Sequence, residues 1–218
     1  MNQPIIFLKF ILITTVTFGQ NASNETLVKR LDSMLYDDQT YRGQLELVQA
    51  RYGGDSKEIK ELLRIIKRKD SINTTKVEVI LNTYGWLGTD RVGEKGNETL
   101  FLVIQHSDLD VQKRYLPMMR EAVKRGNAKS SSLALLEDRV ALRQGKRQIY
   151  VTQIFWDMIS NEYYVFPLSD PDNVDKRRAE VGLEPISDYL SNFNLKWNAA
   201  QYKKELPSIE ARQKLTKT

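Results

Sequence analysis

The chain has 218 residues, a formal net charge of +5 and no cysteine. Without cysteine it has no disulfide bonds, no thiolate metal site and no thiol for a lipid anchor. Its basic residues lie beside carboxylates on helical segments, without interleaved aromatic residues or a nucleic-acid-reading motif. We therefore expect a solvated surface and no nucleic-acid partner, with an acidic partner as the alternative.

The first predicted element is an export signal over residues 1–19. An apolar run from Phe10 to Phe18 follows Lys9 and is about half as long as the ~20 residues that span a bilayer. Thr17 and Gly19 suit a cleavage site, which we place after Gly19. The alternative is an uncleaved N-terminal anchor. We therefore expect an exported protein, periplasmic or secreted, that has no integral membrane anchor once the signal is removed.

Residues 20–72 are predicted to form a helical lead-in. Apolar residues recur at helical spacing over residues 27–35 and again over residues 59–66. Between these two helices, a Gly-Gly pair at 53–54 indicates a stop and a fresh helix start.

The main domain is predicted over residues 73–206, with a polar tail over residues 207–218. It opens with a helix over residues 76–84, followed by a glycine-rich loop around Trp86. A phosphate-binding loop would need a G-K-[ST] ending and a preceding strand, which this segment lacks. The spacing therefore favours a tight turn that positions Trp86.

A buried helix capped by Asn97 is expected next, because residues 100–104 are apolar on every side. His106, the only histidine, falls near the end of this helix, directly after Gln105. One interpretation of His106 is structural, as a hydrogen-bonding residue at a helix terminus. The other is functional, as a general acid or base.

Two further helices are predicted over residues 108–125 and 131–143. The second of them has apolar stripes on two opposite sides, so both sides must be covered. Asp138 and Arg139 flank one stripe and should lie at a packed junction. They form a structural ion pair there, or Arg139 binds an anionic substrate while Asp138 orients a base.

A β-hairpin is predicted over residues 148–167, because β-branched and aromatic residues replace the helical pattern. Gln148 and Tyr150 share one face of its first strand, whereas Gln153 points with the apolar set. A buried glutamine amide needs several partners, so Gln153 either braces irregular backbone or contacts a ligand.

Short helices over residues 174–181 and 186–193 complete the predicted elements. The fold class is therefore mainly α with one β-hairpin, an α+β arrangement. We expect a helical bundle-like single domain packed against a two-stranded hairpin.

Several motifs together resemble the bacterial family known as domain of unknown function 6624. They are Gly85-Trp86, Gln105-His106, Leu136-Glu137-Asp138-Arg139, Gln148-x-Tyr150-x-Thr152-Gln153, and Val174-Asp175-x-Arg177-Arg178 with Gly182-Leu183. The resemblance covers roughly residues 79–190, and in its most specific element, Gln-x-Tyr-Gly-Thr-Gln, Val151 replaces the glycine. The family implies no activity. It implies that one recurring constellation unites His106, Asp138, Arg139, Gln148, Tyr150 and Gln153.

Two functional hypotheses follow from these residues. The first is a ligand-binding or interaction domain with a polar site around His106, whose partner is a small molecule or an envelope component. The second is a periplasmic or secreted hydrolase or transferase, with His106 as general acid or base, Asp138 as orienting carboxylate and Arg139 as anion clamp. The ligand-binding candidates are Gln105, Gln148, Tyr150 and Gln153.

No metal or other cofactor is expected. One histidine and no cysteine leave too few ligands for a zinc site, which usually takes three or four. The chain also lacks the G-x-S-x-G elbow of serine hydrolases, whereas a hydrolase with paired carboxylates stays open.

Overall fold

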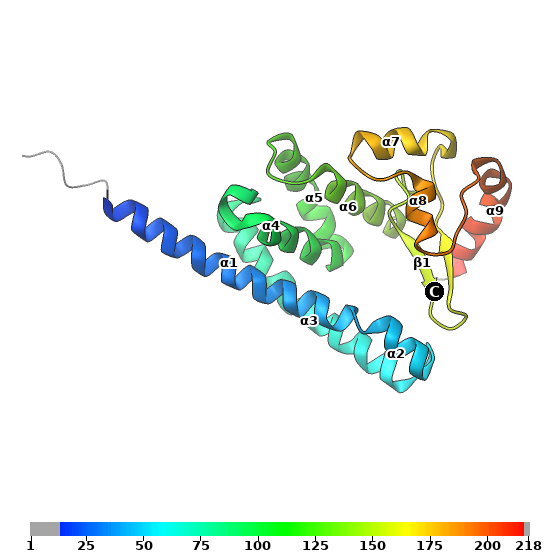
Figure 1. Cartoon of the computed structure of the whole chain (residues 1–218), viewed down its shortest axis with the longest axis horizontal. Helices are drawn as coiled ribbons and strands as arrows, with labels where there is room; N and C mark the ends of the chain where they lie inside the picture. Colours follow the sequence, from blue (N-terminus) through cyan, green and yellow to red (C-terminus); the bar gives the residue numbers. More distant parts are fainter. Residues whose placement is uncertain (1–13, 216–218) are drawn as a thin grey trace, which may run out of the picture.

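The computed structural model describes the backbone of residues 14–215 and the side chains of residues 24–213. The first part is a helical bundle of α1 (Thr14–Arg42), α2 (Leu45–Tyr52), α3 (Lys57–Tyr84), α4 (Thr89–His106), α5 (Leu109–Lys124) and α6 (Ser130–Arg143). The second part, called the C-terminal lobe below, contains β1 (Ile154–Asp157), β2 (Glu162–Val165), η1 (Pro171–Asn173), α7 (Val174–Glu180), α8 (Ile186–Ser191) and α9 (Ala199–Leu215). Figure 1 shows α1 and α3 side by side along one edge of the molecule, with the C-terminal lobe beyond α6. The predicted α+β class is confirmed.

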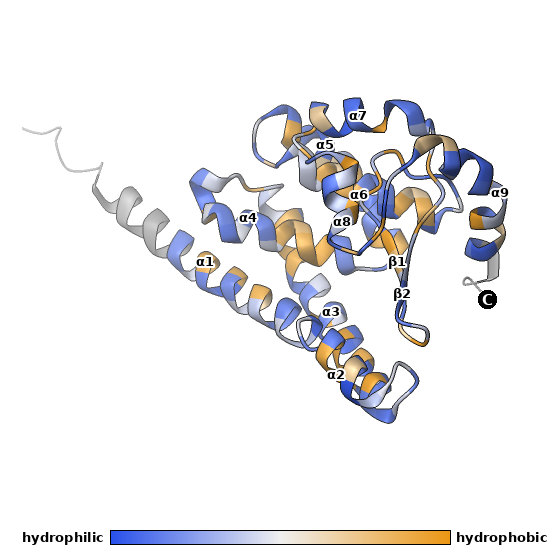
Figure 2. Cartoon of the chain, turned by 45° about the vertical axis from the view of Figure 1, so that its right-hand side comes forward, coloured by the Kyte–Doolittle hydropathy of each residue, from blue (hydrophilic) through white to orange (hydrophobic). Residues whose placement is uncertain are grey.

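The bundle is held by one apolar core to which α1, α3, α4, α5 and α6 all contribute. Leu31 and Met34 of α1 pack with Leu100 and Ile104 of α4, and all four side chains are at most 1% exposed. Their spacing of three or four residues places them on one helix face, which is why these segments fold as helices and pack together. Each such burial contributes about 1.5–3 kcal/mol. In Figure 2 the hydrophobic residues of α4 gather at its end nearest α6.

Helix boundaries depart from the sequence pattern in three places. The helices predicted over residues 59–66 and 76–84 are one continuous helix, α3, which ends before Gly85 at a positive φ of 69°. The boundary predicted at residue 72 therefore falls inside α3. No helix was predicted after residue 193, but α9 spans Ala199–Leu215 and runs through the boundary predicted after residue 206.

Asn97 is not a helix cap, contrary to expectation. It lies inside α4, four residues after the break in this helix at Gly93, which has a positive φ of 70°. Its side-chain amide donates to the carbonyls of Leu87 and Asn127, each at 2.7 Å. The residue thus ties two loops to the helix, a role that sequence spacing does not reveal.

The C-terminal lobe has a smaller core of its own. Its buried residues are Val151, Leu168, Val174, Ile186, Leu190 and Tyr202. The Tyr202 hydroxyl donates to the carbonyl of Phe166 at 3.0 Å and accepts from the amide of Leu168 at 2.7 Å. α9 is thereby fastened to the chain that follows β2.

The hairpin is shorter than predicted, because β1 begins at Ile154 and the 148–153 loop before it is irregular. Antiparallel pairing places Trp156 opposite Tyr163 and Phe155 opposite Tyr164. Residues directly opposite share a face and neighbours alternate, so these two aromatic pairs lie on opposite faces of the hairpin.

The hairpin turn touches the bundle at the α2–α3 turn. The Gln49 amide donates to the carbonyl of Met158 at 3.1 Å. A Cβ on Gly54 would lie 2.0 Å from that carbonyl oxygen, so this close approach requires glycine. Figures 1 and 2 both show the turn reaching toward α2. The C-terminal lobe therefore meets the bundle at α2 as well as beside α6.

The export signal predicted over residues 1–19 lies outside the residues whose side chains are described, so export stays a prediction. Within residues 14–215, no helix combines the length and the apolar character that a membrane crossing requires.

Candidate functional site

A histidine–aspartate dyad forms where α4 ends against α1. Nδ1 of His106 lies 2.9 Å from Oδ1 and 3.0 Å from Oδ2 of Asp38. A carboxylate only accepts hydrogen bonds, so Nδ1 carries the proton and Nε2 keeps its lone pair. No hydrogen bond from another described residue reaches Nε2. The imidazole is therefore oriented at one nitrogen and free at the other.

Neighbours on α1 and α3 hold Asp38 in place. The Gln39 amide donates to Oδ2 of Asp38 at 2.6 Å, and Nη1 of Arg42 donates to the Asp38 carbonyl at 3.3 Å. Nη2 of Arg42 donates to Oδ2 of Asp70 at 2.8 Å. Arg42 follows Asp38 by one helical turn, so both residues face α3 and the end of α4.

Two pKa shifts describe the charge state of the dyad. Burial lowers the pKa of His106 below its ordinary value, and the charges of Arg42 and Arg139 act in the same direction, against the hydrogen bond that Nδ1 donates to Asp38 and the negative charge of Asp38. Burial alone would raise the pKa of Asp38, but its hydrogen bond to His106 and the charges of His106 and Arg42 hold it below its usual range. Near pH 7 the dyad is therefore a neutral imidazole on a carboxylate.

Arg139 is the second component of the site. Its Nε is buried and has no hydrogen-bond partner, and no carboxylate among the described side chains pairs with its guanidinium. Burial lowers the pKa of Arg139 to about 10, and the nearby charges of Arg143 and Arg42 contribute. Arg143 donates to the Ser107 carbonyl at 2.6 Å, directly after His106. The dyad thus borders a concentration of positive charge.

Asp138 is not the carboxylate beside His106. It is fully buried, and its oxygens accept hydrogen bonds from the amides of Ile149, Tyr150 and Thr152 at 2.6–3.2 Å and from the Thr152 hydroxyl at 2.9 Å. Burial raises the pKa of this carboxyl, against the opposing effect of these hydrogen bonds. No ion pair joins it to Arg139 among the described residues, so Asp138 braces the 148–153 loop.

The predicted glutamines also have protein partners. The Gln148 side chain donates to the Phe166 carbonyl at 3.2 Å, and its Oε1 accepts from the backbone N–H of Gln153 at 3.2 Å. Gln105 and Gln153 both donate to the Leu135 carbonyl, at 3.3 and 3.4 Å. Gln105 and Gln153 therefore meet at α6, and all three glutamines brace backbone, although Oε1 of Gln105 is buried without a partner among the described residues.

Tyr150 contributes its backbone amide to Asp138, and its side chain is half-buried. Of the residues predicted for the site, Arg139 is close enough to His106 for its charge to lower the pKa of the imidazole, whereas Asp138 on α6 and the two glutamines, Gln148 and Gln153, hold the 148–153 loop.

A metal ion fits this site poorly. Ligand atoms of Asp38, Asp70 and His106 lie within 4.8 Å of one another, which is close enough for a shared cation. However, the guanidinium of Arg42 already occupies Asp70, and its charge together with that of Arg139 opposes a divalent cation. We therefore assign Oδ2 of Asp70 to Arg42 and the Asp38 carboxylate to the imidazole, while Oδ1 of Asp70 is buried without a partner among the described residues.

Asp38, Arg42 and Asp70 were not singled out from the sequence. A signal for Asp38 exists, because it continues the apolar stripe of Leu31 and Met34 at intervals of seven and four residues. A carboxylate on the buried face of a helix needs a partner, and the structure supplies His106.

A family model described as a family of unknown function matches residues 25–199. This range is wider than the 79–190 that the motifs indicated, and it includes the dyad residue from α1. No curated protein and no solved structure matches the chain.

Proposed function

The chain belongs to the family of unknown function DUF6624, and we propose that it binds a small oxyanion, a carboxylate or a phosphate, between His106 and Arg139. The observation that carries the proposal is the Arg139 guanidinium, which has no acceptor among residues 24–213 although its Nε is buried. An uncompensated buried cation is costly, and an anion would neutralise it. A guanidinium also matches the paired oxygens of carboxylates and phosphates.

Local charge and access support the same ligand. One oxygen of Asp70 is engaged by Arg42 and Asp38 by His106, whereas Arg139 forms no ion pair with any described carboxylate; Asp108 acts electrostatically on Arg143 only. The His106 side chain keeps 14% of its surface exposed, so the imidazole reaches solvent. An incoming anion therefore meets positive charge and a free imidazole nitrogen.

The experiment is a thermal-melting titration of the whole chain with inorganic phosphate, acetate and sulfate, against chloride at equal ionic strength. At ten times its Kd a bound anion adds about 1.4 kcal/mol to the free energy of unfolding, which raises the Tm by a few degrees. We expect this rise in the wild type and its loss in Arg139→Met.

Arg120→Met is the matched control, because Arg120 is half-exposed and already pairs with Glu137 at 2.9 Å. It should respond to the anions like the wild type. The proposal would be contradicted if the anions raised the Tm of the wild type and of Arg139→Met equally. It would also be contradicted if none of the anions raised the Tm of the wild type.

A second candidate function is hydrolysis of an anionic ester, with His106 as general base. Two features favour this candidate. The hydrogen bond from Nδ1 to Asp38 fixes the imidazole ring with its proton on Nδ1, and the lowered pKa of His106 keeps Nε2 unprotonated, as a general base requires. Nε2 would accept a proton from water while the water oxygen attacks phosphorus. The bond from phosphorus to the leaving oxygen would then break, and the leaving group would depart as its anion.

Hydrolysis of 4-nitrophenyl phosphate tests this candidate by release of 4-nitrophenolate. General-base catalysis contributes about 10²–10⁴-fold, so His106→Asn should lose that factor in kcat while phosphate still raises its Tm. The wild-type rate should fall as the pH drops below the lowered pKa of His106, because protonation removes the base. A rate that His106→Asn leaves unchanged would rule the candidate out.

A further inference from the structure

We propose that the ligand of this site carries a planar ring next to its anionic group, and that a row of aromatic side chains in the C-terminal lobe holds the ring. The inference rests on the proposed oxyanion site and names the class of its ligand. The aromatic row consists of Tyr189, Phe193, Tyr163 and Trp156.

The row is continuous from one ring to the next. Tyr189 and Phe193 have ring centroids 5.3 Å apart, Phe193 and Tyr163 are also 5.3 Å apart, and Tyr163 stacks on Trp156 at 5.9 Å. All four side chains are half-buried, so each one keeps accessible surface. A row of partly open rings offers a stacking surface that a fully packed core would not.

One end of the row lies at the oxyanion site. The Arg178 guanidinium lies over the Tyr189 ring at 4.9 Å, and the Tyr189 hydroxyl donates to the Thr152 carbonyl at 3.0 Å, which fixes this ring. The Gln153 side chain donates to the same Thr152 carbonyl at 3.1 Å and to the carbonyl of Leu135 at 3.4 Å, one helical turn before Arg139 on α6. A ligand anchored on Arg139 therefore has Tyr189 as a neighbour.

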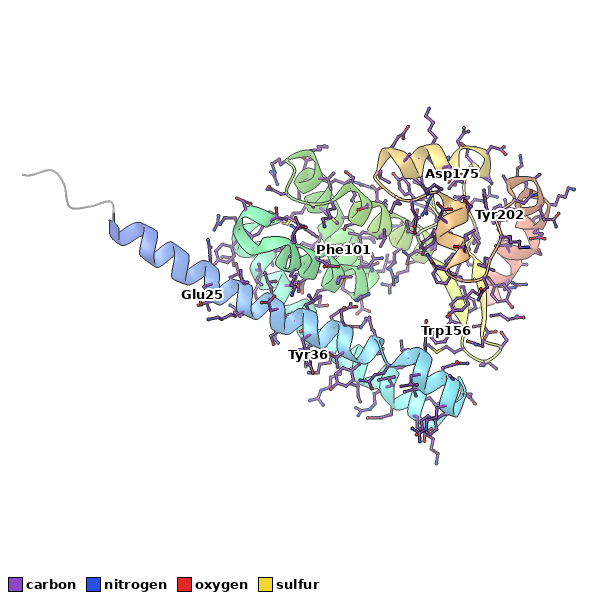
Figure 3. All side chains as sticks on the ribbon, viewed as in Figure 1. Glu25, Tyr36, Phe101, Trp156, Asp175 and Tyr202 are labelled. Carbon is purple, nitrogen blue, oxygen red and sulfur yellow. The ribbon has the colours of Figure 1, made fainter. Side chains whose placement is uncertain are left out.

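The other end of the row lies at α2. Burial raises the pKa of Tyr163, and Glu46 of α2 adds to this shift. The turn beyond Trp156 is held to α2 through the hydrogen bond from Gln49 to Met158. Figure 3 shows Trp156 on the part of the hairpin nearest α2. The row thus runs from the charged site along the side of the lobe that meets the helical bundle.

This arrangement selects ligands by two features at once. The guanidinium recognises the oxyanion, and the aromatic row favours a flat unsaturated ring attached to it, because stacking on aromatic side chains does not depend on a specific hydrogen-bond pattern. Aryl phosphates and aryl carboxylates are the simplest members of this class. An oxyanion that lacks a ring would use only half of the site.

The test compares phenyl phosphate with methyl phosphate by isothermal titration calorimetry, because the two monoesters share a charge and differ in the ring. In the wild type we expect the Kd of phenyl phosphate to be about tenfold lower, as one stacked ring allows. Trp156→Ala and Tyr163→Leu should bring the two Kd values together without weakening methyl phosphate.

Phe155→Ala and Tyr164→Leu are the matched controls, because this pair lies on the opposite face of the same hairpin. They should keep the tenfold preference. A readout in the unmodified chain accompanies the variants: among the three tryptophans, phenyl phosphate should shift the indole NMR signal of Trp156 and leave that of the buried Trp86 unchanged.

The outcomes separate the inference from the function on which it rests. Equal binding of both esters, with no shift of the Trp156 signal, overturns the aromatic subsite and leaves the oxyanion site standing. Failure of both esters to bind overturns both. Loss of the preference in the Phe155 and Tyr164 variants as well would place the ring elsewhere and also overturn the inference.

Discussion

Replacing Asp138 by alanine should lower the free energy of unfolding by at least about 3 kcal/mol, because several buried donors lose their acceptor together. The carboxylate takes hydrogen bonds from the amides of Ile149, Tyr150 and Thr152 and from the Thr152 hydroxyl. Asparagine should not rescue the loss, because its NH₂ group would face backbone donors. Urea unfolding measures the change.

Glu137→Gln is the control, since Glu137 lies one residue away on the same helix and only forms a surface pair with Arg120. Its effect should stay within about 1 kcal/mol. Amide hydrogen exchange should accelerate selectively at residues 149, 150 and 152 in the Asp138 variant. If Asp138→Ala unfolds at the same urea concentration as Glu137→Gln, the brace is not what holds this loop.

The second large effect is a contrast between Arg178, which is buried, and Arg139, which is half-buried. Arg178 is 1% exposed and donates to the carbonyls of Glu184, Tyr150 and Val151 at 2.7–3.1 Å. Arg178→Met would leave these acceptors without a donor, so we expect a loss of about 2–5 kcal/mol in the free energy of unfolding. Arg139→Met removes a cation that has no partner in the described structure, so we expect no loss or a gain.

The same two variants also distinguish a structural Arg139 from a ligand-binding one. Chemical denaturation without added anions gives the stabilities, and addition of phosphate should stabilise the wild type but not Arg139→Met. If Arg139→Met loses as much stability as Arg178→Met in the absence of anions, Arg139 is a structural residue. The proposed site would then lose its main support.

The two arginines show how the polar residues of this fold divide. Asp138, Gln148 and Arg178 satisfy the amides and carbonyls of the 148–153 loop, which is why a regular strand does not form there. His106 and Arg139 keep nitrogen atoms without partners among the described residues. Groups of the first kind stabilise the fold, and the proposed oxyanion site rests on groups of the second kind.

Val151 illustrates a signal that the sequence contained and the structure explains. The Gln-x-Tyr-Gly-Thr-Gln element of the family has glycine at this position. Val151 has a positive φ of 56°, a conformation that β-branched residues disfavour. Its side chain is 0% exposed in the core of the C-terminal lobe. Burial worth about 1.5–3 kcal/mol therefore offsets a backbone strain of about 1–2 kcal/mol.

Local pattern alone determined the fold class and most of the helices. Apolar spacing and glycine stops predicted the helices that became α5, α6, α7 and α8, and β-branched residues with a turn predicted the hairpin. These features depend on neighbours within a few residues, so they are visible in one sequence. The same reasoning identified His106 and Arg139 as unusual polar residues among apolar ones.

The partners of those residues were decided only by the tertiary structure. Asp38 and His106 are 68 positions apart, and they meet because α1 packs along α4 through a shared apolar core. The sequence supplied a nearer carboxylate, Asp138, but its oxygens turn toward the backbone amides of the 148–153 loop. Apolar spacing shows which face of a helix is buried, and only the packing of distant helices determines which polar groups on those faces come within hydrogen-bond distance.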